Sequence, residues 1–535
     1  MLLAASFPLT LPDFPLPEPW GPLPIETPGW IAAAGYGQVP WLALLALIPL
    51  LEVARASMSD LEACLWGYLA GVLWLVPHWL WLLTFGWPPV LLMALFYALP
   101  VGLYALLARR VIAIGRSGLI AWGLPALWVA LEYLRSFGFW AYPWSLLGYT
   151  QARSLGLIQI ADLGGVFAVS FVLVLVNVAL WLVLTPLAGF RPRLGHALLA
   201  AGLLLLTLAY GELRQSMSYA RPYAQPLRLA LVQGGIGTFE RWSEDRMTDT
   251  LAAYVAPSDR ALVEWEGELE SRRAGAAEFV GPRRDGELLV VWPESVLPRS
   301  MDPRREERVP YQLPNLLGGH DDAALLLGAI GRPLDDDHAQ NGCLLVQPDG
   351  EVSWPYGKVR IVPYGEAVPL REVARFLDYP WGSYDLSAGR SAAPLRWRGH
   401  SLGLGVCFDN VFSFLSRRQV RDGAEGFILM TNNSWYELTS GVRQHCDIDV
   451  LRAVEYKRPL ARVSTTGWSH LIAPTGRVVA ETGVRCAGLI TPAMVPAGGS
   501  TVYAVVGDLF AQLCVLAALI MSAGVLIAGR SEGLL

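Results

Sequence analysis

The central part of the sequence contains three groups suited to covalent chemistry, each at the end of a predicted strand or hairpin. They are Glu294, Lys358 and Cys407. A thiol is a poor nucleophile until a base removes its proton, and a carboxylate whose pKa is raised by burial can act as that base. An ammonium beside the sulfur stabilises both the thiolate and the oxyanion of a tetrahedral intermediate. Together these side chains predict acyl transfer through a thioester.

Each of the three residues also has a simpler explanation when it is taken alone. A carboxylate such as Glu294 is favourable at the N-terminus of a helix, and an isolated cysteine is more often a small buried hydrophobe. Lys358 is harder to explain in this way, because only two of the 41 basic residues are lysines. A retained lysine points to a need for a compact charge that a guanidinium cannot supply. The other lysine, Lys457, lies in EYKRP and is interpreted as an ordinary surface cation.

The sequence around these residues alternates apolar strands with helical stretches. The predicted strands are LRLALVQGGI (227–236), ELLVVWPES (287–295), AALLLGAIG (323–331), SLGLGVC (401–407) and GFILMTNNSW (426–435). Helical patterns cover 245–271 and 441–457, and hairpins are predicted at 341–358 and 460–479. Such a mixture indicates a layered α/β domain, in which functional groups lie where strands end.

Long apolar runs flank this domain. Only 16% of the residues are charged, whereas about a quarter are charged in soluble domains. Candidate membrane spans are 38–53, 61–86, 88–108, 117–134, 165–187, 194–212 and 503–528. We therefore predict a membrane helical bundle of about seven spans. The expected parts are a multi-span membrane region at 1–215, a soluble domain at 222–495 and a C-terminal transmembrane helix at 502–528.

The placement of arginines predicts the side of the membrane on which the soluble domain lies. The positive-inside rule places the arginine-bearing loops at 109–116 and 191–193 in the cytoplasm. The span at 194–212 then leads outward, so the soluble domain is expected to be extracytoplasmic. The stretch MLLAASFPLTLP (1–12) is too short to span. Seven spans then put the N-terminus outside, unless residues 1–7 are the tail of an eighth span.

Six cysteines lie at positions 64, 343, 407, 446, 486 and 514, and no spacing among them matches a zinc site. We expect neither a metal nor a cofactor. The cysteines at 64 and 514 are predicted to pack within spans as small apolar residues. The other four lie in a domain that faces an oxidising compartment, where two of them could form a disulfide that the sequence does not assign. The sequence also lacks a phosphate-binding glycine loop and a basic patch for nucleic acid.

Several sequence blocks carry a family resemblance. WPES (292–295), GKVRIVPYGEAVPL (357–370) and GVCFDN (405–410) resemble the Glu-Lys-Cys blocks of the nitrilase superfamily. With the membrane spans, they are similar to the bacterial apolipoprotein N-acyltransferase family. Further matching blocks are LVQGGI (231–236), TNNSWYE (431–437), RAVEYKRPLARVSTTGWS (452–469) and FWAYPWSLLGYTQ (139–151). The resemblance implies eight spans and an extracytoplasmic nitrilase-like α-β-β-α sandwich inserted before the last one.

The resemblance also implies a reaction in the bacterial inner membrane, with the soluble domain in the periplasm. A phospholipid gives an acyl chain to the cysteine, and the thioester passes it to the α-amine of the diacylglyceryl-cysteine of an apolipoprotein. By motif position, Glu294 is the general base, Lys358 the oxyanion stabiliser and Cys407 the nucleophile. The remaining matching positions comprise supporting residues (Glu366, Phe408 and Asp409) and substrate-binding residues (Trp242, Asn432 and Trp435).

The chain departs from the family pattern in three places. The family usually has Tyr-Glu after the nucleophile, where this chain has Phe408 and Asp409. It usually has Asn-Asp-Ala-Trp where this chain reads NNSW (432–435). We also expect the family's first span to be missing or truncated here. These departures put the rate and the substrate choice in question more than the class of reaction.

Two alternative functions stay open at this point. A membrane-tethered amidase or nitrilase would use the same three residues but pass the acyl group to water. A non-catalytic lipoprotein-binding relative would keep the fold without the reaction. The acyl group trapped on the cysteine distinguishes them, because a long chain indicates the transferase and a small group the amidase.

Overall fold

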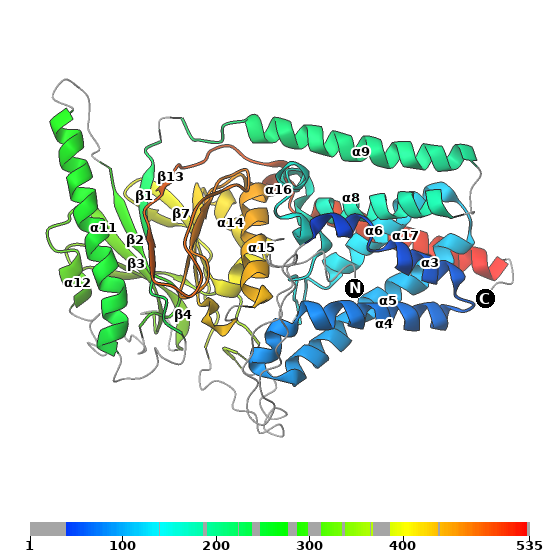
Figure 1. Cartoon of the computed structure of the whole chain (residues 1–535), viewed down its shortest axis with the longest axis horizontal. Coiled ribbons are helices and arrows are strands. Elements are labelled where there is room, and N and C mark those ends of the chain that lie inside the picture. Colours follow the sequence, from blue (N-terminus) through cyan, green and yellow to red (C-terminus); the bar gives the residue numbers. More distant parts are fainter. Residues whose placement is uncertain are drawn as a thin grey trace. The chain divides into compact units, whose positions relative to one another are not determined.

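The computed structural model describes residues 39–138, 140–185, 190–222, 224–237, 247–275, 286–297, 312–333, 338–363, 365–367, 386–436 and 439–531. The chain forms two compact units, which we describe separately (Figure 1). The helical unit comprises Met1–Met217, Leu438–Glu455 and Thr501–Leu535. The sheet unit comprises Ser218–Glu437 and Tyr456–Ser500.

The helical unit contains α-helices and short 3-10 helices, the latter labelled η. In chain order they are η1 (Pro40–Leu44), α3 (Ile48–Ala56), α4 (Asp60–His78), η2 (Leu80–Phe85), α5 (Trp87–Ala113), α6 (Ser117–Leu134), η3 (Leu147–Gln151), α7 (Leu155–Ile158), α8 (Ala161–Leu184), α9 (Phe190–Ser216), α15 (Ser440–Tyr456), α16 (Val502–Val506) and α17 (Leu509–Ser531).

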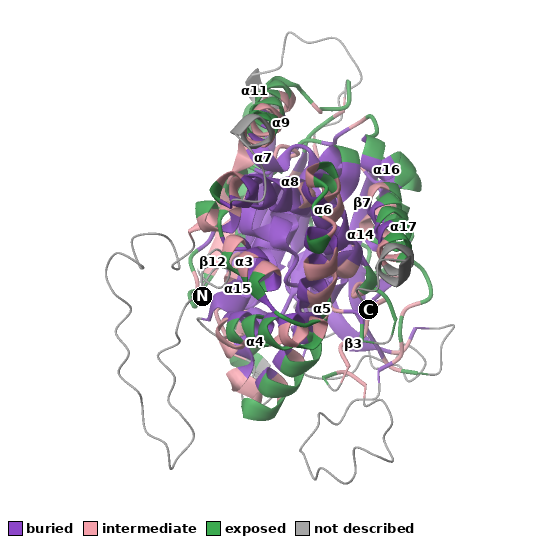
Figure 2. Cartoon of the chain, turned by 90° about the vertical axis from the view of Figure 1, so that its right-hand side faces the viewer, coloured by how far each residue is buried: buried purple, intermediate pink, exposed green. Residues whose placement is uncertain are grey.

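Within the described residues, four helices are long and apolar enough to cross a membrane. They are α5, α6, α8 and the Leu194–Ser216 part of α9, and α17 adds a shorter apolar segment, Leu509–Val525. Large apolar side chains are exposed along several helices, among them Leu61, Leu65 and Leu69 on α4. Figure 2 shows exposed residues on α4. Apolar side chains that face outward in this way are expected of helices in contact with lipid.

The stretch predicted as the first span, 38–53, does not form a single helix. It contains η1 and the beginning of α3, a helix of only nine residues. Both helices have a proline in their first turn. Because proline lacks a backbone N–H and favours the first helical turn, each proline starts a new helix instead of continuing an old one. The prediction of one continuous span here was wrong.

Helices α4 and α5 pack closely through small residues. A Cβ atom built on Gly67 would lie 2.4 Å from the Cβ of Ala105, and one on Gly71 would lie 3.0 Å from the Cβ of Ala98. Larger residues at either glycine would therefore push the helices apart. Close packing through glycine and alanine is typical of membrane helices, whose association gains little from the hydrophobic effect.

Helix α8 contains a break near its beginning. Gly165 has φ +67°, and the preceding Gly164 is also non-helical. The break frees the backbone N–H of Val166, which donates to Glu455 Oε1 of α15 at 2.9 Å. A carboxylate at the start of the continuing helix satisfies an unpaired N–H and favours the helix dipole. This contact ties α15 to α8 within the helical unit.

The sheet unit contains two sheets. The strand order of the first is β12 (Gly488–Ile490), β1 (Leu227–Gln233), β2 (Leu288–Val291), β3 (Ala323–Gly331), β4 (Gln340–Val346) and β5 (Val352–Gly357), with β13 (Ala493–Met494) also paired to β1. The order of the second is β11 (Val478–Glu481), β10 (His470–Ile472), β9 (Leu460–Ser464), β8 (Gly426–Thr431), β7 (His400–Val406) and β6 (Leu395–Trp397). The strands and both hairpins predicted from the sequence are therefore confirmed.

Each sheet has three parallel strands at its centre. In the first sheet β1, β2 and β3 are parallel, with Leu229 opposite Leu289 and Leu289 opposite Ala324. In the second sheet β7, β8 and β9 are parallel, with Ile428 opposite Leu404 and Ala461. The remaining neighbours are antiparallel. Strands of the two sheets lie against each other, β1 against β9 and β4 and β5 against β7.

Helices cover the outer faces of the two sheets. Helix α11 (Met247–Gly275) packs on β1 and β2 and also contacts α12 (Gln312–Leu316). Helix α14 (Ser413–Arg421) packs on β7 of the other sheet (Figure 1). The layers are thus helix, sheet, sheet and helix. This agrees with the α-β-β-α sandwich that the family resemblance implied.

The core between α11 and the first sheet anchors the end of β2. Trp292 is fully buried there, its ring centroid lies 5.3 Å from that of Tyr254, and its Nε1 donates to Ser258 Oγ at 2.9 Å. Replacing a buried tryptophan by alanine typically costs about 3–5 kcal/mol. The indole therefore fixes the chain two residues before Glu294.

Candidate active site

Cys407 stands where β7 ends and the 3-10 helix η7 (Cys407–Val411) begins. Its φ is +48°, in the left-handed region that residues with a side chain seldom adopt. Such a conformation costs about 1–3 kcal/mol and recurs at functional sites, where the surrounding structure holds it. The side chain is 6% exposed. The position predicted as the nucleophile is therefore held in a strained turn at the end of a buried strand.

Glu294 follows β2 and is held by hydrogen bonds from two other segments. Its Oε1 accepts from Asn341 Nδ2 at 2.7 Å, and its Oε2 accepts from the backbone N–H of Asn432, also at 2.7 Å. A glycine makes room for the turn, because a Cβ atom on Gly328 of β3 would lie 2.5 Å from the Cα of Glu294. The carboxylate is buried and fixed at both oxygens.

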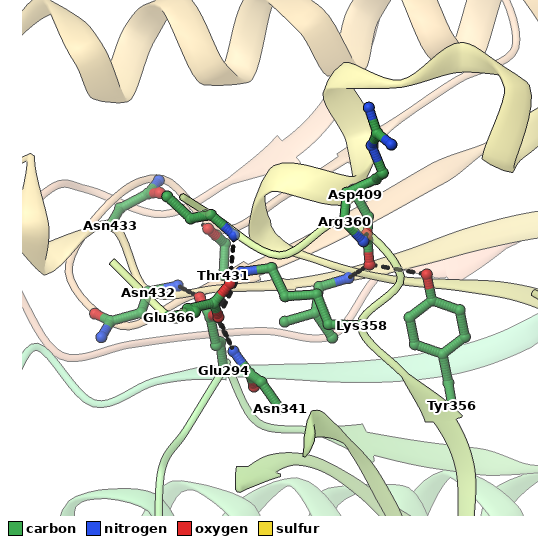
Figure 3. Close-up of polar contacts among 12 residues, drawn as sticks. Glu294, Asn341, Tyr356, Lys358, Arg360, Glu366, Asp409, Thr431, Asn432 and Asn433 are labelled. Carbon is green, nitrogen blue, oxygen red and sulfur yellow. Dashed lines mark hydrogen bonds and ion pairs between the residues drawn. The ribbon is translucent and has the colours of Figure 1, made fainter. Parts of the chain in front are cut away.

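Lys358 follows β5 directly and is 1% exposed. Its Nζ lies 2.8 Å from Glu366 Oε1 and 3.5 Å from Glu294 Oε1 (Figure 3). Burial alone would lower the pKa of Lys358, but the two carboxylates outweigh it and raise the pKa above its ordinary value. The lysine is therefore a permanent ammonium between two carboxylates.

Residues at the end of β8 connect Glu294 to Cys407. The side chain of Thr431, the last residue of β8, hydrogen-bonds the Cys407 sulfur. The next residue, Asn432, binds Glu294 through its backbone. Base and thiol are thus held by consecutive residues of one strand end. The carboxyl ends of the parallel strands β2, β7 and β8 meet here, where α/β folds place their sites.

Cys407 rests as a thiol. Burial, and next the charge of Glu294, raise the pKa of Cys407 to about 12, although Lys358 and the hydrogen bond from Thr431 lower it. At neutral pH almost no thiolate exists before substrate binds. Nucleophilic chemistry at this sulfur would therefore need a base that removes its proton, and the charge of the Glu294 carboxylate acts on the thiol.

Glu366 and Asn341 complete the hydrogen-bond network around the ammonium. Glu366 Oε1 accepts from both Lys358 Nζ and Asn341 Nδ2, each at 2.8 Å, and its Oε2 accepts from the Val362 N–H at 2.9 Å. Asn341 therefore donates to both carboxylates (Figure 3). The structure places Glu366, a supporting position predicted from the sequence, in contact with Lys358. Asn341 was not predicted; its only signal in the sequence is a polar residue opposite Lys358 in a buried hairpin.

Asp409 joins the cysteine segment to the lysine segment. Its Oδ1 accepts from the Arg360 N–H at 2.8 Å, and its Oδ2 accepts from the Tyr356 hydroxyl at 2.8 Å and the Val406 N–H at 3.2 Å. The carboxyl is buried, and burial raises its pKa to about 6, although Lys358 and these hydrogen bonds lower it. Asp409 is 2% exposed and links the segment that carries Cys407 to the segment that carries Lys358.

Comparison with known proteins agrees with this arrangement. The apolipoprotein N-acyltransferase N-terminal domain matches residues 29–179, and the carbon-nitrogen hydrolase family model matches residues 228–499. The apolipoprotein N-acyltransferase of Geobacter metallireducens is 33% identical over 83% of this chain and 80% of its own length. The chain belongs to the apolipoprotein N-acyltransferase family. It is thus an acyltransferase of lipoprotein biosynthesis, and the family expected from the sequence blocks is confirmed.

A second member of the family extends the match over almost the whole chain. The apolipoprotein N-acyltransferase of Gloeobacter violaceus is 30% identical over 93% of this chain and 91% of its own length. A Saccharomyces cerevisiae protein of branch 10 of the nitrilase superfamily is 20% identical over 52% of this chain and 93% of its own, with a TM-score of 0.36.

The other predicted family positions have different surroundings. Phe408 is buried, with its ring centroid 5.2 Å from that of Phe412. Asn432 is buried and accepts from Thr465 Oγ1 at 2.9 Å, whereas Trp435 at the end of η8 (Asn433–Trp435) is 37% exposed. Trp242 lies outside the described residues. Substrate binding by Asn432, Trp435 and Trp242 stays a prediction, and the visible role of Asn432 is to hold Glu294.

Two further expectations are settled by the structure. Lys457, interpreted as a surface cation, is only 2% exposed, has φ +50°, and places its Nζ 5.2 Å from the centre of the Tyr219 ring. That interpretation was wrong, because the residue after α15 turns back in the left-handed conformation typical of helix ends. The six cysteines all lie in the described residues and form no disulfide with one another, so the disulfide that the sequence allowed is not formed.

We expect Asp409→Ala to lower thioester formation about ten- to a hundredfold. The change leaves the Tyr356 hydroxyl and the backbone N–H groups of Arg360 and Val406 without their acceptor, at about 1–3 kcal/mol for each buried group. Asp409→Glu restores an acceptor and should stay within a few-fold of the wild type. The measurement is the rate of Cys407 acylation, followed by mass spectrometry. An unchanged rate in Asp409→Ala would show that this carboxyl does not position the site.

Proposed function

We propose that this chain transfers an acyl chain from a phospholipid, through a thioester on Cys407, to the α-amino group of the N-terminal diacylglyceryl-cysteine of apolipoproteins. The observation that carries the proposal is the buried cluster of Glu294, Lys358 and Cys407 in a member of this family. Each group has a chemical role that the reaction requires and that its surroundings support.

In the first half-reaction, Glu294 takes the proton of Cys407 as the sulfur attacks the ester carbonyl of the phospholipid. A carbon–sulfur bond forms, and the carbonyl oxygen becomes an oxyanion that the Lys358 ammonium stabilises. The carbon–oxygen bond of the ester then breaks. Glu294 returns the proton to the departing lysophospholipid, leaving Cys407 as a thioester.

In the second half-reaction, the neutral α-amine of the apolipoprotein attacks the thioester carbonyl. Glu294 accepts a proton from this amine and passes it to the departing sulfur, so that an amide and the free thiol result. Lys358 again stabilises the oxyanion. Glu366 and Asn341 hold the ammonium and the base in place through both halves, since they contact both groups.

The proposed reaction is tested with the purified full-length protein in detergent micelles. A phospholipid alone should leave a long acyl chain on the protein, and a synthetic peptide that begins with diacylglyceryl-cysteine should then remove it and gain an amide-linked chain. Release of free fatty acid with no change in the peptide would support a hydrolase that uses water as acceptor. No acylation of the protein would contradict the proposal.

We also place the sheet unit in the periplasm and the helical spans in the bacterial inner membrane. Arginines favour a cytoplasmic position for the 109–116 loop. Reporter fusions after Arg116 and after Pro348 should therefore report opposite sides, with an alkaline phosphatase fusion active only at Pro348. The same side for both fusions would contradict this orientation.

A further inference from the structure

A cation beside the active site has no partner in the reaction described so far. Arg360 lies two residues after Lys358, and its backbone N–H donates to Asp409, two residues after Cys407. Among the described residues, its guanidinium makes no hydrogen bond and no ion pair. Figure 3 shows this side chain extending away from the Asp409 carboxyl, so the backbone contact leaves the guanidinium available.

Aromatic rings hold the guanidinium in place. Its central carbon lies 4.0 Å from the centre of the Phe412 ring and 5.8 Å from that of Phe414. Phe412 is buried, whereas Phe414 is 48% exposed. Stacking on a ring fixes the orientation of an arginine while leaving its N–H donors free to bind another group. The result is a partly desolvated cation with fixed direction, next to the nucleophile's turn.

The chemistry of the two substrates decides which of them this cation fits. The acceptor presents an amine, whose protonated form a nearby guanidinium repels. The donor carries a phosphodiester, separated from its ester carbonyls by one glycerol unit. Guanidinium groups bind phosphate oxygens in a bidentate manner, and such charge-assisted bonds are among the stronger ones in proteins. Phe414 offers an apolar surface next to the same position for the glycerol and the start of an acyl chain.

We propose that Arg360 binds the phosphodiester of the acyl donor and gives the site its preference for phospholipids over neutral acylglycerols. This inference rests on the proposed function, because it concerns the donor of the same reaction. Arg360 is a binding residue in the first half-reaction. It contacts the lysophospholipid as that leaves, and it takes no part in the proton transfers.

The test compares three acyl donors with full-length protein in detergent micelles: dioleoyl phosphatidylglycerol, dioleoyl phosphatidylcholine and dioleoylglycerol. The rate of Cys407 acylation is measured for the wild type, for Arg360→Gln, and for Arg360→Lys, which keeps the charge but loses the planar fork. Arg418→Gln serves as the matched control. Arg418 is exposed on α14, and its replacement by glutamine removes one positive charge, as Arg360→Gln does.

In Arg360→Gln, the preference for either phospholipid over dioleoylglycerol should fall about tenfold, the effect of losing about 1.4 kcal/mol of binding. Arg360→Lys should lie between it and the wild type, and Arg418→Gln should keep the wild-type preference. An equal loss with all three donors, no loss with phospholipids, or a loss with only one of the two phospholipids would overturn the assignment. If the wild type is acylated by none of the donors, the proposed function fails, and this inference fails with it.

Discussion

We expect the Cys407→Ala variant to fold like the wild type and to form no thioester, with transfer reduced at least about 10⁴-fold. Losses of this size follow removal of a nucleophile in enzymes that use a covalent intermediate. Folding should be little affected, since the change removes a single sulfur atom, and alanine meets the same strain at φ +48° that cysteine already bears. Intact-mass measurement after incubation with phospholipid reports the acyl chain, and a thermal melt reports the fold.

Cysteines elsewhere in the sheet unit are matched controls. Cys486→Ala changes an exposed thiol, and Cys343→Ala changes a buried one in β4 whose pKa is also raised by burial. Both variants should be acylated at close to the wild-type rate. An acyl chain on either of these residues, or a fully active Cys407→Ala enzyme, would contradict the assignment of the nucleophile.

The parts of the site that could be predicted from the sequence are those fixed by local pattern. Buried strands show as apolar runs, and Glu294, Lys358 and Cys407 stand out because polar groups end such runs. The structure brings Glu294 and Lys358 to 3.5 Å, and it joins Cys407 to the same network through Thr431. Local pattern also indicated the two hairpins, since their turns contain proline and glycine.

The parts that could not be predicted depend on contacts between segments far apart in the sequence. Asn341 is an ordinary polar residue until β4 and β5 pair and bring it beside both carboxylates. Tyr356 and Arg360 acquire their roles only when the hairpin end meets Asp409 of the other sheet. The family resemblance pointed to position 409, but the reason for an acid there is the set of three donors that converge on it.

Hydropathy alone was also insufficient for the helices. Hydropathy reports how apolar a segment is but not where a helix ends, so the separate helices η1 and α3 were predicted as one span. The break in α8 at Gly165 could be suspected from the Gly-Gly pair. Its carboxylate partner, Glu455, comes from a segment almost three hundred residues later. Long-range hydrogen bonds of this kind leave no periodic signal in a sequence.

We expect Glu294→Gln to lower the rate of Cys407 acylation about 10²–10⁴-fold at neutral pH, the usual contribution of a positioned base. The amide can still accept from the Asn432 N–H, so the turn after β2 should persist, but it cannot take a proton from the thiol. A matched control is Glu351→Gln, on the exposed turn of the β4–β5 hairpin, which should leave the rate unchanged.

The two effects of this substitution on the thiol have opposite signs, which makes the prediction specific. The charge of Glu294 raises the pKa of Cys407, which is about 12 in the wild type, so its removal should lower that pKa and make the thiolate more abundant. Alkylation of Cys407 by iodoacetamide should therefore begin at a lower pH in the variant, while acylation by phospholipid falls. At pH values below the new pKa, the residual acylation should rise about tenfold for each unit of increasing pH. The reason is that hydroxide must now remove the proton that Glu294 is expected to accept in the wild type. If alkylation shifted to higher pH, the charge of Glu294 would not be a cause of the raised pKa of Cys407. If acylation kept its wild-type rate at pH 7, Glu294 would not be the base, and the thiol would be activated by another group.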